Sequence, residues 1–387
     1  MHNVIQDSAV IDQGAEDTQP EKIEGLDTGS GTGWGDYPLN SVFIRTATRP
    51  VGDVVRRIRK GRYQLDPDFQ RDFIWPEDKQ SRLIESCLMR IPLPVFYLAE
   101  AQDGRIIVVD GLQRLATFSR FLDGKFALKG LNDSQDDGKL TPQLDGKRFK
   151  DLPLDLQERI EDTQLTLYIL DRKAPERAKL DIFERVNSGV ALSRQQMRNS
   201  LYNGSATRWL REASEDDSFR KVIRGGLDRK KMRDREAINR FCAFYLWGYR
   251  EYKAGDMDAF LARTLVKMNQ QEEEKKLDSM RTDFQRSIDL NYFLFRGHAF
   301  RKSLAYNGYN TARTVINISL FDVFSVLFTQ VDKTLIEENK ENAREIARNL
   351  LNNHKFEHAV SYSTNSTGQV RDRFSLAQEA FKDMIKC

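Results

Sequence analysis

Val108-Val109-Asp110-Gly111-Leu112-Gln113-Arg114-Leu115 predicts a strand, a tight turn and a helix in immediate succession. The residues from Ile106 to Val109 are all apolar, which indicates a buried strand. Asp110-Gly111 turns the chain, and the residues that follow place Leu115, Phe118 and Leu122 on one face of a helix over 112–122. This succession predicts a domain that mixes strands and helices.

The turn itself has the properties of an anion site. The first amides of a helix have no partners within the helix, and with the helix dipole they attract negative charge. Gly111 would let a phosphate approach the backbone closely. Arg114 is poorly placed relative to the dipole, and a phosphate between the turn and its guanidinium would explain that position. The alternative is an ordinary strand–helix turn in which Arg114 forms a surface salt bridge.

The elements around this turn predict an α+β domain over residues 39–205. Helices are expected at 53–60, from Pro76 onward and from Pro175 to Val186, and strands at 95–98 and 165–170. Ser193 and Gln196 match a capping box at the start of another helix. From residue 206 to 387 the patterns are helical, which predicts a mainly helical second domain. Residues 1–38 are acidic and rich in Gly, Ser and Thr, which is typical of a disordered tail.

Composition sets limits on the class of protein. The 61 basic and 58 acidic residues nearly cancel, so any contact with DNA must come from a local patch. The three cysteines are far apart and match neither a disulfide framework nor a zinc site. The sequence has no signal-peptide pattern and no apolar run long enough to span a membrane. We therefore expect a cytoplasmic protein with no membrane partner.

Four sequence blocks, in order, resemble the GmrSD N-terminal family, a branch of the ParB/sulfiredoxin-like fold. Asp110-Gly111-Leu112-Gln113-Arg114-Leu115 is similar to the family's Asp-Gly-Gln-Gln-Arg-Leu signature. Residues 70–75 resemble the family's Gln-Arg…Trp pattern, and residues 83–94 resemble its Leu-Ile-x-Ser…Ile-Pro-x-Pro pattern. Residues 183–189 resemble its Phe-x-Arg-Leu-Asn-x-Gly pattern. Together the blocks span about residues 50 to 205.

The resemblance implies binding and hydrolysis of a nucleoside triphosphate, coupled to DNA restriction or phage defence. The implied cofactor is Mg²⁺. The resemblance also implies two possible partners, which are DNA and a separate nuclease subunit. Two positions depart from the family pattern: Leu112 replaces the first Gln of the signature, and Gln196 stands where a glutamate is usual. If that glutamate helps to bind metal, hydrolysis would be weak or absent. The four histidines do not form the cluster that an attached HNH-type nuclease domain would need.

The candidate catalytic residues are Asp110, Gln113 and Arg114. Asp110 would hold Mg²⁺ or orient Arg114, and Gln113 would hold a water molecule or the nucleotide. The candidate nucleotide-binding residues are Gln70, Arg71, Gly111, Arg185 and Asn187. Arg185 and Asn187 could equally serve as helix-end residues. Phe69, Phe73 and Trp75 could stack on a base beside Arg71, or could be core residues, which is the better expectation for Trp75.

Two further segments carry candidate chemistry. The stretch 220–240 is basic, and its candidate DNA-binding residues are Arg224, Arg229, Lys230, Lys231 and Arg233. Acidic residues are interleaved there, so a solvated helix face is the alternative. His354-Lys355-Phe356-Glu357-His358 matches the spelling of inverted zinc proteases, but no third ligand is obvious downstream.

These observations leave three functional hypotheses. The first is a Mg²⁺-dependent nucleoside triphosphatase with phosphates held at Asp110–Arg114. The second is a non-catalytic module that senses nucleotide or DNA and switches a partner. The third is a nuclease that uses the same pocket on DNA, as proposed for ParB-like folds.

Overall fold

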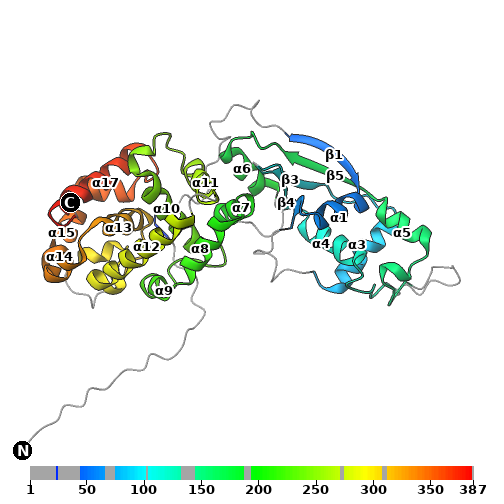
Figure 1. Cartoon of the computed structure of the whole chain (residues 1–387), viewed down its shortest axis with the longest axis horizontal. Helices are drawn as coiled ribbons and strands as arrows, with labels where there is room; N and C mark the ends of the chain where they lie inside the picture. Colours follow the sequence, from blue (N-terminus) through cyan, green and yellow to red (C-terminus); the bar gives the residue numbers. More distant parts are fainter. Residues whose placement is uncertain are drawn as a thin grey trace, which may run out of the picture.

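The computed structural model describes residues 23–24, 44–65, 75–101, 103–131, 144–186, 193–270, 274–306 and 312–385. Figure 1 shows a sheet-containing domain at one end of the molecule and a helical region at the other. This confirms the predicted α+β domain followed by a mainly helical remainder. Among the described residues, no helix combines the length and apolar character needed to cross a bilayer.

The N-terminal domain is built on one five-stranded sheet with the order β1-β5-β3-β4-β2. β1 and β5 are antiparallel, as are β3 and β4, whereas β3–β5 and β2–β4 are parallel pairs. The strands are β1 (Ile44–Pro50), β2 (Tyr63–Gln64), β3 (Phe96–Glu100), β4 (Ile106–Asp110) and β5 (Gln164–Leu170). β4 therefore lies inside the sheet with a neighbour on either side, which agrees with its continuous apolar sequence.

Helices cover both faces of this sheet. On one face, α1 (Val51–Arg59), α3 (Glu77–Leu88), α4 (Leu112–Leu122) and α5 (Leu154–Glu161) enclose the larger core. On the other face, α6 (Glu176–Val186) and α7 (Arg194–Leu201) pack against Ile107 and Val109. A short 3-10 helix, η2, spans Phe149–Asp151. The sequence analysis did not predict three of these elements, which are the strands β1 and β2 and the helix α5.

The predicted boundaries of the other elements hold to within a few residues. The first helix begins at Val51 rather than Asp53, because Pro50 adopts the extended conformation of a residue that precedes a helix. Its buried face consists of Val51, Val54 and Val55. Pro76 precedes α3 in the same way, and α4 covers the predicted range 112–122.

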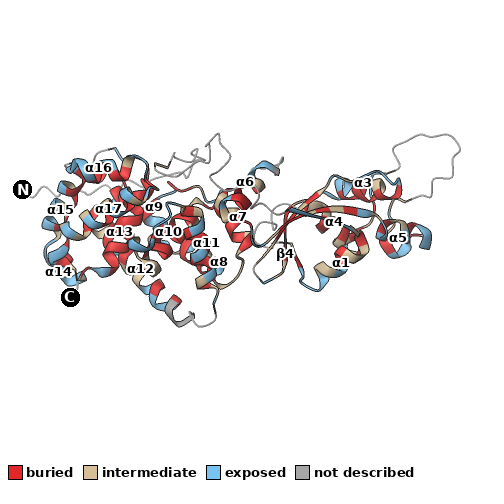
Figure 2. Cartoon of the chain, turned by 90° about the horizontal axis from the view of Figure 1, so that it is seen from above, coloured by how far each residue is buried: buried red, intermediate tan, exposed pale blue. Residues whose placement is uncertain are grey.

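The helical region has a separate core. Its α-helices are α8 (Ser205–Glu215), α9 (Asp217–Ile223), α10 (Arg233–Trp247), α11 (Met257–Met268), α12 (Glu274–Phe295), α13 (Ile318–Gln330), α14 (Lys333–Glu338), α15 (Lys340–Asn352), α16 (His354–Ser361) and α17 (Thr367–Ala380). The 3-10 helices are η3 (Tyr249–Glu251), η5 (Arg296–His298), η6 (Lys302–Ala305) and η7 (Lys382–Met384). In Figure 2 the central helices α10 and α13 are largely red, and α13 is buried along nearly its whole length.

Of the predicted tail 1–38, the structure describes only Ile23 and Glu24. These two residues lie on the helical region. The Glu24 amide donates to the Ile316 carbonyl (2.9 Å), the Ile318 amide donates to the Glu24 carbonyl (2.9 Å), and Lys302 Nζ lies 2.7 Å from the Glu24 carboxylate. The chain therefore touches the helical region before it enters β1 of the sheet.

Candidate functional site

The turn between β4 and α4 depends on a glycine for packing reasons. Gly111 has φ +95°, a left-handed conformation that L side chains rarely adopt. A Cβ atom at this position would lie 2.3 Å from Cδ1 of Phe96, at the start of β3. The glycine is thus explained by the Phe96 ring, without a phosphate. Among the described residues no side chain caps α4, and its first internal bond runs from the Leu115 amide to the Gly111 carbonyl.

Arg114 is engaged by the protein itself. Its guanidinium donates to the Pro94 carbonyl and to the Val95 carbonyl (3.1 Å) and lies 3.0 Å from Oδ2 of Asp110. It also stacks over the Phe96 ring, with Cζ 4.2 Å from the centroid. Only 12% of the side chain is exposed, and burial lowers the pKa of Arg114. The salt bridge of the alternative interpretation exists, with an arginine that is largely buried, and the bonds to the Pro94 and Val95 carbonyls tie α4 to the segment before β3.

Gln113 links the turn to the upstream Gln-Arg block. Its Oε1 accepts a hydrogen bond from the Trp75 amide (3.1 Å), and the Trp75 carbonyl accepts one from Gln80 Nε2 (2.5 Å). Trp75 is half-buried against the larger core and carries Lys79 over its ring at 4.3 Å. Gln70 and Arg71 lie outside the described residues, as do Phe69 and Phe73. The Trp75–Gln113 bond places the flank after that segment beside the turn, whereas β2, which precedes the segment, pairs with the first residues of β4.

The remaining candidates of the N-terminal domain lie elsewhere. Arg185 is in the last turn of α6, and its side chain is exposed. Asn187 lies outside the described residues. Gln196 forms the predicted capping box: its Oε1 accepts from the Ser193 amide (2.7 Å), and its Nε2 donates to the Lys230 carbonyl (2.9 Å). A glutamate could accept the first bond but could not donate the second. Gln196 therefore serves here to hold the chain at Lys230.

The basic stretch 220–240 is largely occupied by internal contacts. Arg233 Nη1 lies 2.7 Å from Glu236, and Arg229 Nε lies 3.7 Å from Asp234. Ser193 donates to the Lys231 carbonyl (2.6 Å), so the backbone of this stretch is bound to the start of α7. The side chains of Arg224, Lys230 and Lys231 are exposed, and the proposed DNA contact at this stretch stays a prediction.

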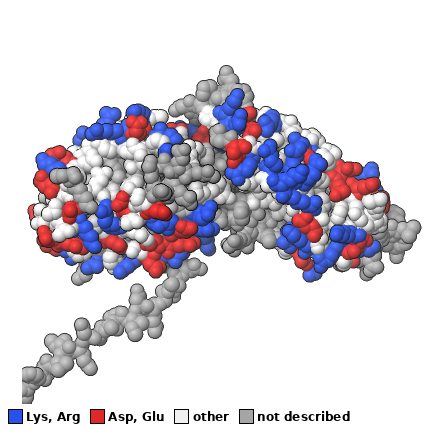
Figure 3. All heavy atoms as spheres, in the orientation of Figure 1, with Lys and Arg blue, Asp and Glu red and all other residues white. Residues whose placement is uncertain are grey.

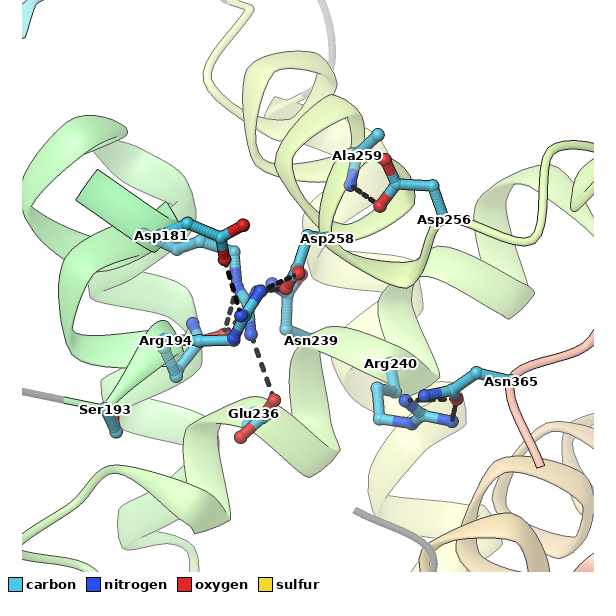
Figure 4. Close-up of polar contacts among 12 residues, drawn as sticks. Asp181, Ser193, Arg194, Glu236, Asn239, Arg240, Asp256, Asp258, Ala259 and Asn365 are labelled. Atoms are coloured by element: carbon cyan, nitrogen blue, oxygen red, sulfur yellow. Dashed lines mark hydrogen bonds and ion pairs between the residues drawn. The ribbon is translucent and has the colours of Figure 1, made fainter. Parts of the chain in front are cut away.

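A polar network joins the two parts of the molecule next to this stretch. Arg194 of α7 lies between Asp181 of α6 (2.8 Å) and Asp258 of α11 (Figure 4). One helical turn later, the fully buried Arg198 donates to Asp258 (2.6 Å) and to Glu236 of α10 (3.0 Å). Four helices are thereby connected through two guanidiniums. Sequence reasoning missed this network, because its hydrogen-bonded partners are up to 64 residues apart.

A cavity of about 380 Å³ lies close to this junction. Its charged lining residues are four cations and one carboxylate, namely Arg172, Lys173, Lys179, Arg263 and Glu176. Lys179 is already bonded to Glu176 (2.9 Å) and to the Arg172 carbonyl (3.1 Å). The residues of the β4–α4 turn do not line this cavity.

The protease-like motif on α16 does not form a metal site. Glu357 accepts from Ser361 (2.8 Å) and pairs with Lys302, and His358 Nδ1 lies 3.2 Å from Gln369. Within the described ranges there is no group of three His, Cys, Asp or Glu residues arranged to hold a metal ion. The zinc-protease alternative thus has no support in the geometry.

Sequence reasoning also passed over a cluster of arginines on α1. Asp53 accepts from Arg49 Nη1 (3.0 Å), from Arg57 Nε (2.8 Å) and from Arg56. Three guanidiniums therefore share one carboxylate. The hydrogen bond from Arg57, aided by those from Arg56 and Arg49, lowers the pKa of Asp53 to about 2. The signal was available, because basic residues dominate the sequence from Arg45 to Arg62.

Comparison with protein families assigns the N-terminal domain. A search of curated proteins found no significant match. Residues 51–203 match the model of the GmrSD restriction endonuclease, N-terminal domain. The matched segment contains the β4–α4 turn and all four blocks of the resemblance and ends just after α7. Residues 51–203 of this chain therefore belong to the GmrSD N-terminal domain family.

Proposed function

We propose that this protein acts in DNA restriction or phage defence and binds the phosphates of a nucleoside triphosphate at the start of α4. The family description, a restriction endonuclease N-terminal domain, supports the biological setting. The observation that carries the phosphate site is the β4–α4 turn: α4 begins directly after an interior strand, and no described side chain caps it. Amides in that position attract anions, and 11 helical residues supply the dipole.

In this proposal Arg114 is a positioning residue rather than a phosphate ligand. Its donors are directed at Pro94, Val95 and Asp110. It keeps the segment before β3 against the turn and fixes the Asp110 carboxylate beside the helix start. The phosphates would then be bound by the amides of residues 112–114 and by Arg71, which precedes Trp75 by four residues in the sequence; the Trp75 amide donates to Gln113.

The cation would be held through Asp110. Mg²⁺ commonly binds proteins through one or two carboxylates together with substrate phosphates, so a single carboxylate is sufficient when the nucleotide brings the ion. One third of the Asp110 side chain is exposed, and its Oδ2 faces Arg114. The bound ion would neutralise phosphate charge next to the helix start.

One observation favours binding without turnover as a second candidate. Gln196 stands where the family pattern has a glutamate. Both the oxygen and the nitrogen of its side-chain amide form hydrogen bonds within the protein. If the family glutamate supports hydrolysis, this chain would bind nucleotide and hydrolyse it slowly or not at all.

Titration with a fluorescent nucleoside triphosphate, with and without Mg²⁺, tests the proposal. We expect Arg71→Ala to weaken binding at least about tenfold, which corresponds to the loss of one charge-assisted contact. Arg229→Ala, which removes an exposed arginine of the helical region, is the matched control and should bind as the wild type does. Equal affinities for wild type and Arg71→Ala would contradict the site.

Turnover is measured separately. Phosphate release from the purified protein distinguishes an enzyme from a binding module, and a plasmid-nicking assay with and without Mg²⁺ tests nuclease activity. Faster phosphate release by Gln196→Glu than by the wild type would show that the glutamine at this position slows hydrolysis.

A further inference from the structure

A dense group of basic residues lies at the beginning of the N-terminal domain, with a net charge equal to that of the stretch 220–233. Residues 44–62 contain seven basic side chains and one acidic side chain, whereas the whole chain has a net charge of only +3. The basic residues are Arg45, Arg49, Arg56, Arg57, Arg59, Lys60 and Arg62. In Figure 3 the blue side chains gather over the α1 face of this domain. We call this set the α1 basic face.

Most of these side chains are accessible. Arg56 is 65% exposed, Arg59 49% and Arg45 51%, and Lys60 and Arg62 are also exposed. Each guanidinium has five N–H donors, and the single Asp53 carboxylate cannot occupy those of three arginines. The donors that remain can therefore meet an external anion.

Nearby acidic groups reduce the charge but do not cancel it. Glu100 lies 3.1 Å from Arg45, and Asp123 at the end of α4 lies 2.7 Å from Arg59. Lys125 in turn lies 3.4 Å from Asp123. Glu161 of α5 approaches Gly52 on α1. With these included, cations still outnumber carboxylates on the α1 basic face by about two to one.

We propose that the α1 basic face binds the phosphate backbone of double-stranded DNA. A duplex presents one negative charge per about 1.7 Å of axis, so a helix about 13 Å long together with β1 faces several phosphates at once. Arginine and lysine contacts of this type hold a protein on DNA without reading its sequence. The inference deepens the proposed function, because it rests on DNA as the macromolecular partner.

The duplex would then contact a helix that packs against α4, and Arg59 of that helix pairs with Asp123 at the end of α4 opposite the turn. α1 packs against both α4 and β2, and α4 begins at the β4–α4 turn. A shift of α4 on nucleotide binding would be transmitted directly to the helix that carries the basic residues. We therefore expect DNA affinity to respond to nucleotide.

Charge on an edge strand has a simpler role, which is to prevent pairing with another chain. β1 is an edge of the described sheet, so this role accounts for Arg45 and Arg49. It does not account for the five cations between Arg56 and Arg62, which lie on α1 and in the turn that follows it.

The test compares three triple variants of the full chain by fluorescence anisotropy with a labelled duplex of about 30 base pairs over a range of salt concentrations. The first, Arg56→Gln/Lys60→Gln/Arg62→Gln, removes three charges of the α1 basic face and leaves Arg49 and Arg57 on Asp53. The matched control, Lys333→Gln/Lys355→Gln/Lys382→Gln, removes three exposed charges from the helical region. The third, Arg229→Gln/Lys230→Gln/Lys231→Gln, tests the other basic stretch.

We expect the α1 triple to weaken DNA binding at least about 30-fold near 0.1 M salt and to reduce the slope of log K against log salt by about 2–3. The control should reproduce the wild type. The inference is overturned if the α1 triple binds DNA as tightly as the control does, or if only the Arg229 triple loses DNA affinity. In both cases a restriction role with DNA as partner still stands. If the wild type binds no duplex at all, the DNA partner itself is excluded, whereas the nucleotide titration remains an independent measure of the proposed function.

Discussion

The two parts of this protein each use one aspartate to serve several arginines, but they do so in opposite surroundings. On α1, Asp53 accepts from Arg49, Arg56 and Arg57 at the surface. In the helical core, Asp322 of α13 accepts from Arg240 of α10 (2.9 and 2.6 Å) and Arg373 of α17 (2.9 Å), and all three side chains are buried. The surface cluster retains donors for a partner, whereas the buried cluster holds three helices together.

The surroundings explain this difference. A charge taken out of water is costly unless it is paired and hydrogen-bonded, so each buried arginine takes acceptors besides the aspartate. Arg373 also donates to the Thr364 carbonyl, and Arg240 reaches Asn365 Oδ1 (3.3 Å). Burial lowers the pKa of Arg373 to about 10. A sequence rich in arginine therefore indicates nothing about DNA until burial is known.

The largest expected effect is the loss of the buried carboxylate. Asp322→Ala leaves Arg240 and Arg373 without a counter-charge in the core, and we expect a loss of about 3–5 kcal/mol in the free energy of unfolding. Urea denaturation measures it. Asp289→Ala, which removes an exposed carboxylate of α12, is the control and should change stability by less than about 0.5 kcal/mol. A small effect at Asp322 would mean that the two clusters are equivalent after all.

The β4–α4 turn lies between these extremes and should give an intermediate effect. In Gly111→Ala the added methyl would meet the Phe96 ring in a left-handed backbone conformation, so we expect a loss of more than about 2 kcal/mol. Gly104 has a similar φ of +79°, but no atom lies within 4 Å of a Cβ added there. Gly104→Ala therefore measures the loss of stability that comes from the backbone conformation alone. Equal losses in thermal unfolding of the two variants would show that Phe96 does not restrict the turn.

The smallest expected effect on stability is at the surface cluster. Asp53→Asn removes an accessible ion pair, and we expect a loss within about 1 kcal/mol at neutral pH. The pKa of Asp53 is about 2, below the usual value near 4, so its stabilisation is fully present above about pH 4 and is lost as the pH falls through 2. Melting temperatures of wild type and Asp53→Asn should therefore approach each other from about pH 4 downward; a difference that does not shrink between about pH 4 and pH 2 would contradict this assignment.

Several features of the candidate site were predictable because they depend on neighbours in the sequence. The strand, the turn and the helix around Gly111 follow from the apolar run and the helical period, and the Ser193–Gln196 capping box spans three residues. The contacts of Arg114 were not predictable, because Pro94 and Val95 are about 20 residues away. For the same reason the bond from Gln196 to the Lys230 carbonyl could not be anticipated.

By itself, the sequence determined most of the elements around the β4–α4 turn, the position of that turn and the family of residues 51–203, because periodicity and short motifs are local properties of the chain. Only the tertiary structure decided which charges remain available. Arg114, Arg233 and Arg240 are bound by carboxylates or carbonyls of the protein, while most of the α1 basic face stays exposed to solvent. The reason is physical: the free energy of an arginine depends on its burial and its acceptors, and both are set by segments distant in the sequence.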